Sequence, residues 1–184
     1  MRLNNKISLV TGAGSGFGRG IASRFVEEGA KVVVADINQE AAEMVAEEIG
    51  ENAIAIVADV SQNTDVSAMI QLTVEQYGRL DILVNNAGTT HRNKLMTEVS
   101  EEEFDQILAV NVKSVFLTAK HIVPLMKKQG SGVILNVAST AGVRPRPGLA
   151  WYNTSKGAMI AATKAMAIEL APEKIRVNAI NPVA

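Results

Sequence analysis

Cysteine is absent from this sequence, and an excess of charge of either sign is nearly absent as well. Without cysteine, a disulfide framework and thiolate metal sites are excluded, and the chain can work in a reducing compartment. The 18 basic and 19 acidic side chains leave a formal net charge of -1, which supplies no general attraction for nucleic acid or an anionic membrane. We therefore expect a cytoplasmic protein with no metal centre and no nucleic-acid or membrane partner.

A long apolar run is the third feature that we do not find in the sequence. The N-terminus leads directly into a predicted strand, without the apolar segment of a secretory signal, and no stretch reads as a membrane span. What the sequence does have is 47% hydrophobic and 20% charged residues over 184 positions, both near the globular average. This composition predicts one domain with a packed core, residues 1–184.

Short runs rich in β-branched residues alternate with longer helical stretches along the whole chain. The runs are residues 6–10, 31–35, 53–58, 81–85, 132–138 and 175–180. Each is largely apolar without clean alternation, which is typical of parallel strands covered on both faces. Because crossovers between parallel strands are right-handed, the helices fall on both faces of the sheet. The pattern predicts a doubly wound α/β domain.

Helix starts are marked by capping residues. Asn38 and Ser61 are placed to cap the helices that follow the second and third strands, and Ser100 with Glu103 forms a capping box. The last of these opens a long helix that we expect to run to about Lys128.

This long helix and the last one carry surplus apolar or small residues. Residues 104–126 are apolar on more than a single stripe, and residues 157–171 are rich in alanine. One interpretation is a deeply buried helix pair within the monomer. The other is a subunit interface, which would make the protein a homo-oligomer, a dimer or a tetramer.

A glycine-rich loop, T-G-A-G-S-G-F-G, follows the first strand at residues 11–18. The usual G-x-G-x-x-G does not fit, because the spacing here is Gly12, Gly16 and Gly18. A strand that enters a helix through such a turn still directs unpaired backbone N–H groups and the positive helix end at one point. The loop therefore predicts a site for the pyrophosphate of a dinucleotide.

Two carboxylates lie at the ends of the next strands. Asp36 can accept hydrogen bonds from the ribose hydroxyls of the adenosine, and it would repel a 2'-phosphate. Ile37 follows it and Ser15 lies in the loop, so neither position supplies a positive charge. This favours NAD over NADP as the cofactor. Asp59, at the end of the third strand, is placed to meet the adenine.

The candidate reacting groups lie near the fifth strand. Tyr152 and Lys156 are four residues apart on a helix and therefore share a face. A free phenol is a poor acid or base at neutral pH, and an adjacent ammonium stabilises its phenolate. Ser139 ends the fifth strand, at the edge where doubly wound domains bind ligands, and can donate to a carbonyl there.

These motifs resemble the short-chain dehydrogenase/reductase family. The residues that carry the resemblance are T-G-A-G-S-G-F-G, the N-N-A-G of residues 85–88, Ser139, and Tyr152 with Lys156, in this order and spacing. It covers the whole chain and implies a Rossmann-type domain that transfers a hydride between NAD(H) and a secondary alcohol or ketone. The implied cofactor-binding residues are Thr11, Gly12, Ser15, Gly16, Phe17, Gly18, Asp36, Ile37, Asp59, Val60, Asn86, Ala87, Gly88, Tyr152 and Lys156, with Asn85 supporting the sheet.

The resemblance also implies a catalytic tetrad of Asn111, Ser139, Tyr152 and Lys156. In this assignment Tyr152 transfers the proton and Ser139 holds the substrate oxygen. Lys156 binds the nicotinamide ribose and tunes Tyr152, and Asn111 supports a water relay.

The sequence departs from the family at its end. The family normally continues beyond the Asn181–Pro182 turn with a substrate lid, a seventh strand and a final helix, whereas this sequence stops at Ala184. We therefore expect the seventh strand and final helix to be absent. Two alternatives stay open: an NADP-dependent 3-oxoacyl-thioester reductase, and a catalytically silent dinucleotide-binding module.

The loop between Ser139 and Tyr152 adds a hypothesis about the substrate. Arg144 and Arg146 alternate with prolines there, so at most one of them faces the substrate, with Arg92 as a second contact. Arginine recognises carboxylates and phosphates, which would indicate an acidic substrate. The alternative, which we favour, is that both arginines are solvated or pair with acidic residues of a neighbouring subunit.

Overall fold

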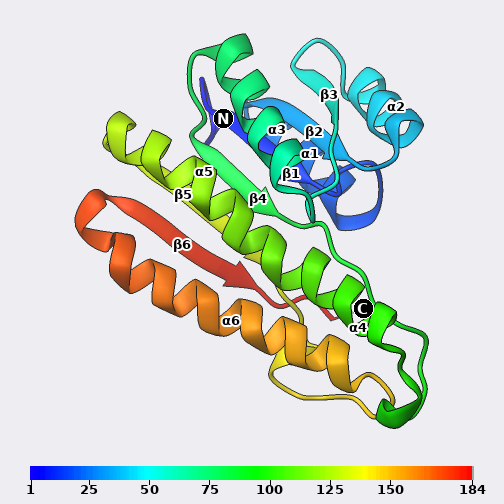
Figure 1. Ribbon diagram of the computed structural model, residues 1–184. Coiled ribbons are helices and arrows are strands. Elements are labelled where there is room, and N and C mark those ends of the chain that lie inside the picture. The colour runs from blue at the N-terminus through cyan, green and yellow to red at the C-terminus, as the bar shows by residue number, and fades with distance from the viewer. Residues whose placement is uncertain (184) are drawn as a thin grey trace.

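Six parallel strands form a single sheet in the computed structural model, which describes residues 1–183 (Figure 1). The strands are β1 (Ile7–Thr11), β2 (Lys31–Asp36), β3 (Ala53–Val57), β4 (Ile82–Asn85), β5 (Gly132–Val137) and β6 (Ile175–Ile180). Their order in the sheet is β3-β2-β1-β4-β5-β6, and every neighbouring pair is parallel. Each strand end lies within one residue of its predicted position, so the six predicted strands are confirmed.

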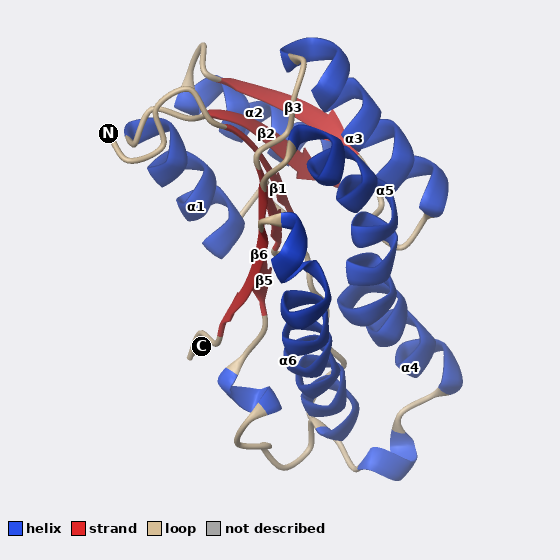
Figure 2. Cartoon of the chain, turned by 90° about the vertical axis from the view of Figure 1, so that its left-hand side faces the viewer, coloured by secondary structure: helices blue, strands red, loops and turns tan. Residues whose placement is uncertain are grey.

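Helices cover both faces of this sheet, which confirms the doubly wound α/β fold (Figure 2). They are α1 (Gly16–Glu27), α2 (Gln39–Ile49), α3 (Asn63–Tyr77), α4 (Glu101–Leu108), α5 (Ser114–Gln129) and α6 (Ala150–Leu170). Helices α1 and α2 lie on one face, and α3, α5 and α6 lie on the other. Within residues 1–183 the sheet ends at β6, and the predicted end of the domain, Ala184, lies outside the described residues.

The sheet separates two apolar cores. Leu9 and Leu83 pack toward α3, α5 and α6, whereas Val10 and Val84 pack toward α1 and α2, and all four are fully buried. Neighbouring residues of one strand thus enter different cores, because successive side chains point to opposite faces. This is why the strands read as continuous apolar runs rather than as alternating ones.

The strand order reverses at β1, which lies between β2 and β4. The crossover after β1 goes to one face and the crossover after β4 goes to the other, so the loops that leave their carboxyl ends diverge. A crevice opens between such loops, and doubly wound folds bind ligands there. The glycine-rich loop and the N-N-A-G segment follow these two strands.

Two of the three predicted caps are confirmed. Asn38 accepts a hydrogen bond from the Ala41 amide (3.0 Å) at the start of α2. The Ser100–Glu103 capping box at the start of α4 is present in both directions.

The third cap, Ser61, is a wrong prediction. Helix α3 begins at Asn63 after Gln62, which makes no side-chain capping bond. The Ser61 amide donates instead to the Asp59 carboxylate (2.9 Å). An Asp side chain that bonds the backbone two residues on forms a turn of its own, and this turn moves the helix start beyond Ser61.

The long predicted helix is continuous but not uniform. Helix α4 leads through a π-helical turn, Ala109–Lys113, into α5, which ends at Gly130 in the left-handed conformation (φ 74). Within this 29-residue helix, Glu101–Gln129, an 18-residue window has a mean hydropathy of 1.2, so the helix is long and apolar enough to cross a membrane by length and composition alone. The sequence did not indicate a span in this stretch, and a match by length and composition alone is weak evidence for one. Core helices pass the same test, and Ile122 and Met126 are fully buried against the sheet.

Candidate active site

The glycine-rich loop is shaped by positions where a side chain has no room. Gly12 and Gly16 have positive φ angles of 61° and 53°. A Cβ on Gly12 would lie 2.8 Å from the Ala87 Cα, and one on Gly18 would collide with the Gly12 carbonyl. Nothing lies within 4 Å of a Cβ on Gly16, so the start of α1 faces open space.

The first backbone N–H groups of α1 receive no side-chain cap. Ser15 is the N-cap residue but makes no side-chain capping bond. The first N–H groups of a helix have no partner within it, and together with the helix dipole they favour a bound anion. The loop therefore meets the requirement of a pyrophosphate site.

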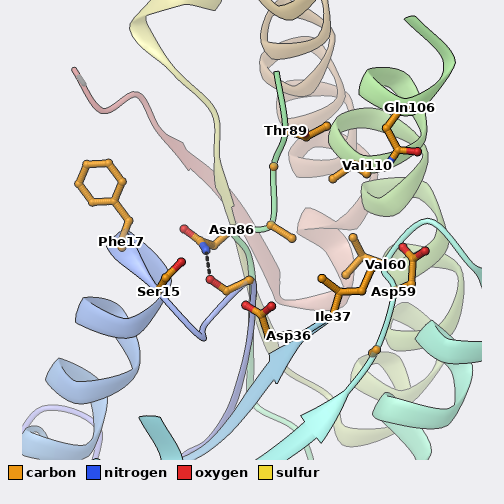
Figure 3. A pocket seen from close by; sticks show the side chains of 15 residues that line it. Ser15, Phe17, Asp36, Ile37, Asp59, Val60, Asn86, Thr89, Gln106 and Val110 are labelled. Carbon is orange, nitrogen blue, oxygen red and sulfur yellow. Dashed lines mark hydrogen bonds between the residues drawn. The ribbon is translucent and has the colours of Figure 1, made fainter. Parts of the chain in front are cut away.

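Asn86 and Thr11 hold this loop in place through hydrogen bonds. The Asn86 side-chain amide donates to the Thr11 carbonyl (2.8 Å) and to the Gly12 carbonyl (3.0 Å) (Figure 3). The Thr11 hydroxyl donates to the Val84 carbonyl and accepts from the amides of Asn86 and Ala87. Thr11 thus ties β1 to the segment after β4 and is itself buried.

A cavity of about 470 Å³ opens above the loop (Figure 3). Eleven of the residues predicted to bind the cofactor line it: Gly12, Ser15, Gly16, Phe17, Asp36, Ile37, Asp59, Val60, Asn86, Ala87 and Gly88. Four more that the sequence did not indicate also line it: Ala58, Thr89, Gln106 and Val110. Of the predicted residues, Thr11 and Gly18 lie beneath the cavity and do not line it.

Asp36 is anchored at the edge of this cavity. One carboxylate oxygen accepts from the Gly14 amide (2.9 Å) and the other from the Asn38 amide (3.0 Å). A Cβ on Gly14 would lie 3.0 Å from the Asp36 carboxylate, so glycine permits this approach. A carboxylate offers about four acceptor positions, and two remain for a ligand.

A second cavity, of about 280 Å³, adjoins the first and holds three members of the predicted tetrad. It is lined by Phe17, Asn86, Gly88, Thr89, Thr90, Val137, Ala138, Ser139, Tyr152, Lys156 and Pro182. Four of these, Phe17, Asn86, Gly88 and Thr89, also line the larger cavity. A molecule that extends from Asp36 along the loop therefore ends beside Ser139, Tyr152 and Lys156.

Lys156 is a buried cation next to Tyr152. Its Nζ donates to the Val137 carbonyl (2.9 Å) and lies 5.8 Å from the centroid of the Tyr152 ring. Burial lowers the pKa of Lys156 to about 8, because the charged form loses hydration. The ammonium form thus still prevails at neutral pH.

Ser139 lies where β5 ends. Its hydroxyl oxygen accepts from the Ala141 amide (3.1 Å), which fixes the side chain at the start of a short 3-10 helix, Thr140–Gly142. A hydroxyl that accepts a hydrogen bond keeps its own proton, and Ser139 can therefore donate to an oxygen in the smaller cavity.

Asn111, the fourth predicted member, lies behind Thr89 and lines neither cavity. Its Oδ1 accepts from the Thr89 amide (2.8 Å), and its Nδ2 donates to the Thr89 carbonyl (2.8 Å) and to the Ser155 hydroxyl (2.9 Å). Both amide protons are therefore used. Ser155 was not indicated by the sequence, since an inward-facing Ser on a helix carries no signal of its own.

The arginines of the loop after Ser139 do not line the smaller cavity. Arg144 and Arg146 are exposed and contribute to neither cavity. Arg92 lines a separate depression beside Glu102 and Glu103. The geometry thus lends no support to recognition of an acidic substrate by these side chains.

The fold and the two adjoining cavities are those of a dinucleotide-binding oxidoreductase, with a serine, a tyrosine and a lysine in the lining of the smaller cavity. The chain matches the sequence profile of the family described as short chain dehydrogenase over residues 6–184, and it belongs to that family.

Several relatives are similar over the whole chain. A 4-formylbenzenesulfonate dehydrogenase of Comamonas testosteroni is 49% identical over 100% of this chain and 74% of the relative. The crystal structure of a 3-ketoacyl-(acyl-carrier-protein) reductase from Brucella melitensis, complexed with NADH, is 52% identical with a TM-score of 0.98, over 99% of this chain and 76% of that one. An NAD+-bound xylitol dehydrogenase is 38% identical with a TM-score of 0.95, over 99% and 71%.

Proposed function

We propose that this protein transfers a hydride between NAD(H) and a secondary alcohol or ketone. The observation that carries the choice of NAD is the charge of the larger cavity, whose lining contains the carboxylates Asp36 and Asp59 and, among the described residues, no lysine or arginine. A 2'-phosphate on the ribose would meet a carboxylate there without a compensating cation. Two similar structures hold NADH and NAD+, which supports the same choice.

The residues present fit a nicotinamide dinucleotide. The cradle around Gly12 and Gly18 has no room for side chains, the uncapped start of α1 faces open space, and the two cavities join end to end. Asp36 would hold the adenosine ribose, and Lys156 the nicotinamide ribose. When bound, this cofactor supplies or accepts the hydride.

The protein supplies the proton and fixes the geometry. Ser139 donates a hydrogen bond to the substrate oxygen, which orients it beside Tyr152. The Tyr152 hydroxyl gives its proton to a ketone oxygen during reduction and takes it back during oxidation. The Lys156 ammonium, held by the Val137 carbonyl, stabilises the phenolate that Tyr152 becomes when it has given up its proton.

A turnover assay with a panel of secondary alcohols and NAD tests this function, together with the variant Tyr152→Phe. Phe removes only the hydroxyl, so we expect NADH binding to persist while turnover falls by about 10²–10⁴-fold. NADH binding without turnover in the parent would instead identify a silent dinucleotide-binding module. An active Tyr152→Phe variant would show that another group transfers the proton.

A second candidate is a 3-oxoacyl-thioester reductase that uses NADP. Its substrate class, though not its cofactor, is favoured by the similarity to the Brucella melitensis reductase and by a 3-oxoacyl-[acyl-carrier-protein] reductase of Thermotoga maritima, 40% identical over 99% of this chain and 75% of the relative. The same panel separates the candidates when it includes a 3-oxoacyl thioester assayed with NADPH.

We further propose that the protein acts on its small-molecule substrate in the cytoplasm as a homo-oligomer, a dimer or a tetramer. Exposed apolar side chains on α5 and α6 support self-association, with Phe116 62% exposed and Ile168 79% exposed. A groove between these helices is lined by Val123, Pro124 and Met166, among others.

A further inference from the structure

Ser155 occupies a buried position between the two reacting side chains of α6. It is fully buried and lies three residues after Tyr152 and directly before Lys156. Its hydroxyl donates to the Tyr152 carbonyl (2.7 Å) and accepts from the Asn111 side-chain amide (2.9 Å). Ser155 thus joins the turn of α6 that carries Tyr152 to the π-helical turn that carries Asn111.

The second half of this connection reaches the wall of both cavities. Asn111 uses its remaining amide atoms to hold the backbone N–H and C=O of Thr89. Thr89 lines both the larger and the smaller cavity. The chain of contacts therefore runs from Tyr152 through Ser155 and Asn111 to Thr89.

The two side chains in the middle of this connection are shielded from solvent. Asn111 and Ser155 are both without exposed surface, so water cannot replace a lost partner. If Ser155 were removed, one Asn111 N–H would be buried without an acceptor, and the amide would rotate to find one. Such a rotation would release Thr89 on one side and the first turn of α6 on the other.

We propose that Ser155 is a positioning residue that fixes the Tyr152 turn of α6 against Asn111, so that the Tyr152 hydroxyl and the Lys156 ammonium keep the geometry needed for proton transfer. Ser155 lines neither cavity, so it acts through other residues and does not touch the substrate. This inference rests on the proposed function only in assigning proton transfer to Tyr152.

The first test does not depend on turnover. The chain has two tyrosines, so Tyr77→Phe leaves Tyr152 as the sole source of phenolate absorbance. In this background we expect Ser155→Ala to change the pH at which that absorbance appears, because the ring of Tyr152 and the side chain of Lys156 no longer keep their relative positions. The matched control is Thr154→Ala, which removes an exposed hydroxyl that donates to the Ala150 carbonyl of the same helix (2.9 Å). An unchanged titration in Ser155→Ala, or an equal shift in the control, would overturn the proposal.

The second test uses the active enzyme. We expect Ser155→Ala to lower kcat about 10-fold while the Kd for NADH changes less than about twofold, because the loss concerns proton transfer and not the glycine loop. Ser155→Cys keeps the approximate size of the side chain, but its thiol forms weaker hydrogen bonds than a hydroxyl. We expect its kcat to lie between those of the parent and Ser155→Ala. If both variants lose NADH binding, Ser155 has a general structural role and the proposal is wrong.

A double-mutant cycle identifies the partner. If Ser155 acts through Asn111, the variant Asn111→Ala/Ser155→Ala has the same kcat as Asn111→Ala alone. Independent, multiplicative losses would contradict the proposed connection. Should the parent turn over no alcohol at all, the proposed function fails, while the phenolate titration still decides the role of Ser155.

Discussion

The proposed preference for NAD depends on the charge of one side chain, Asp36. Asp36→Asn keeps the shape and removes the negative charge, so we expect the preference for NADH over NADPH to shrink by about 10-fold or more. Fluorescence titration with both cofactors measures this ratio. Glu75→Gln is the control, since it makes the same change in net charge on the exposed surface of α3. Equal affinities for the two cofactors in the parent would refute the assignment of Asp36.

The buried charge of Lys156 predicts a pH dependence of stability. Burial lowers its pKa to about 8 in the folded chain from 10.5, so between these values the unfolded chain binds more protons than the folded one. Stability must then rise with pH across this window, because the cost of burying the ammonium disappears.

We therefore compare urea unfolding of the parent with that of Lys156→Met at pH 7 and pH 9.5. From pH 7 to pH 9.5, the free energy of unfolding of the parent should rise by about 2 kcal/mol relative to that of the variant. Lys164→Met, at an exposed position of the same helix, should show no such change relative to the parent. If the difference in unfolding free energy between the parent and Lys156→Met is the same at both pH values, burial does not lower the pKa of Lys156.

The sequence predicted the site residues whose proximity follows from a single helix or strand. It did not predict the residues whose hydrogen-bond partners lie on a different element. Tyr152 and Lys156 share a helix face, and Ser139 ends a strand, so their proximity could be predicted. The burial of Ser155 against Asn111 depends on how α6 packs on the π-helical turn, and neither segment records this in its own pattern. Thr11 was assigned to the cofactor, but the structure places it below the loop, because a buried hydroxyl bonds the nearest backbone.

Among the secondary-structure elements, the central strands and α6 are joined by buried side chains as well as by the backbone. The Asn85 amide donates to Asn136 Oδ1 (2.9 Å), and the Asn136 amide donates to the Thr163 hydroxyl (2.9 Å). This line of contacts crosses β4, β5 and α6. Each amide needs its partner to satisfy its hydrogen bonds, so the contacts oppose any shift of register between the two strands.

The chain offers a matched pair of threonines to test this network. Thr163 and Thr73 are both buried, and each donates to the carbonyl four residues earlier in its own helix. Only Thr163 also accepts from Asn136 among the contacts described. We expect Thr163→Val to lower the free energy of unfolding by about 1–2 kcal/mol more than Thr73→Val, because an Asn136 N–H is left unpaired. Chemical denaturation measures both, and equal losses would show that the network contributes nothing.

The strands were predicted more accurately from the sequence than the helices. Strands buried on both faces are marked by their apolar residues alone, and all six were located within one residue. The start of α3 was misplaced because Asp59 forms a competing turn with Ser61. The π-helical turn at 109–113 could not be predicted, since one extra residue in a helical turn leaves the apolar pattern on either side intact.

For the whole molecule, the open question raised by the sequence was what covers the surplus apolar surface of the last two long helices. The apolar window of the helix Glu101–Gln129 is only 39% buried within the chain. Helices α5 and α6 lie beside one another on the same face of the sheet, with their outer sides away from it (Figures 1 and 2). A second copy of the chain would cover these sides and remove the apolar area from water.

Charge placed on this surface should therefore separate the subunits. Phe116 lies one helical turn before the groove residues Ala119 and Lys120, and its side chain is 62% exposed. In the proposed oligomer Phe116→Glu would bury a charge in an apolar interface, so we expect dissociation to the monomer at micromolar concentration by light scattering. Leu72→Glu, at a half-exposed apolar position on α3, is the control and should leave the mass unchanged. A parent that already scatters as a monomer would contradict the proposed oligomer. Dissociation by Leu72→Glu alone would move the interface to α3.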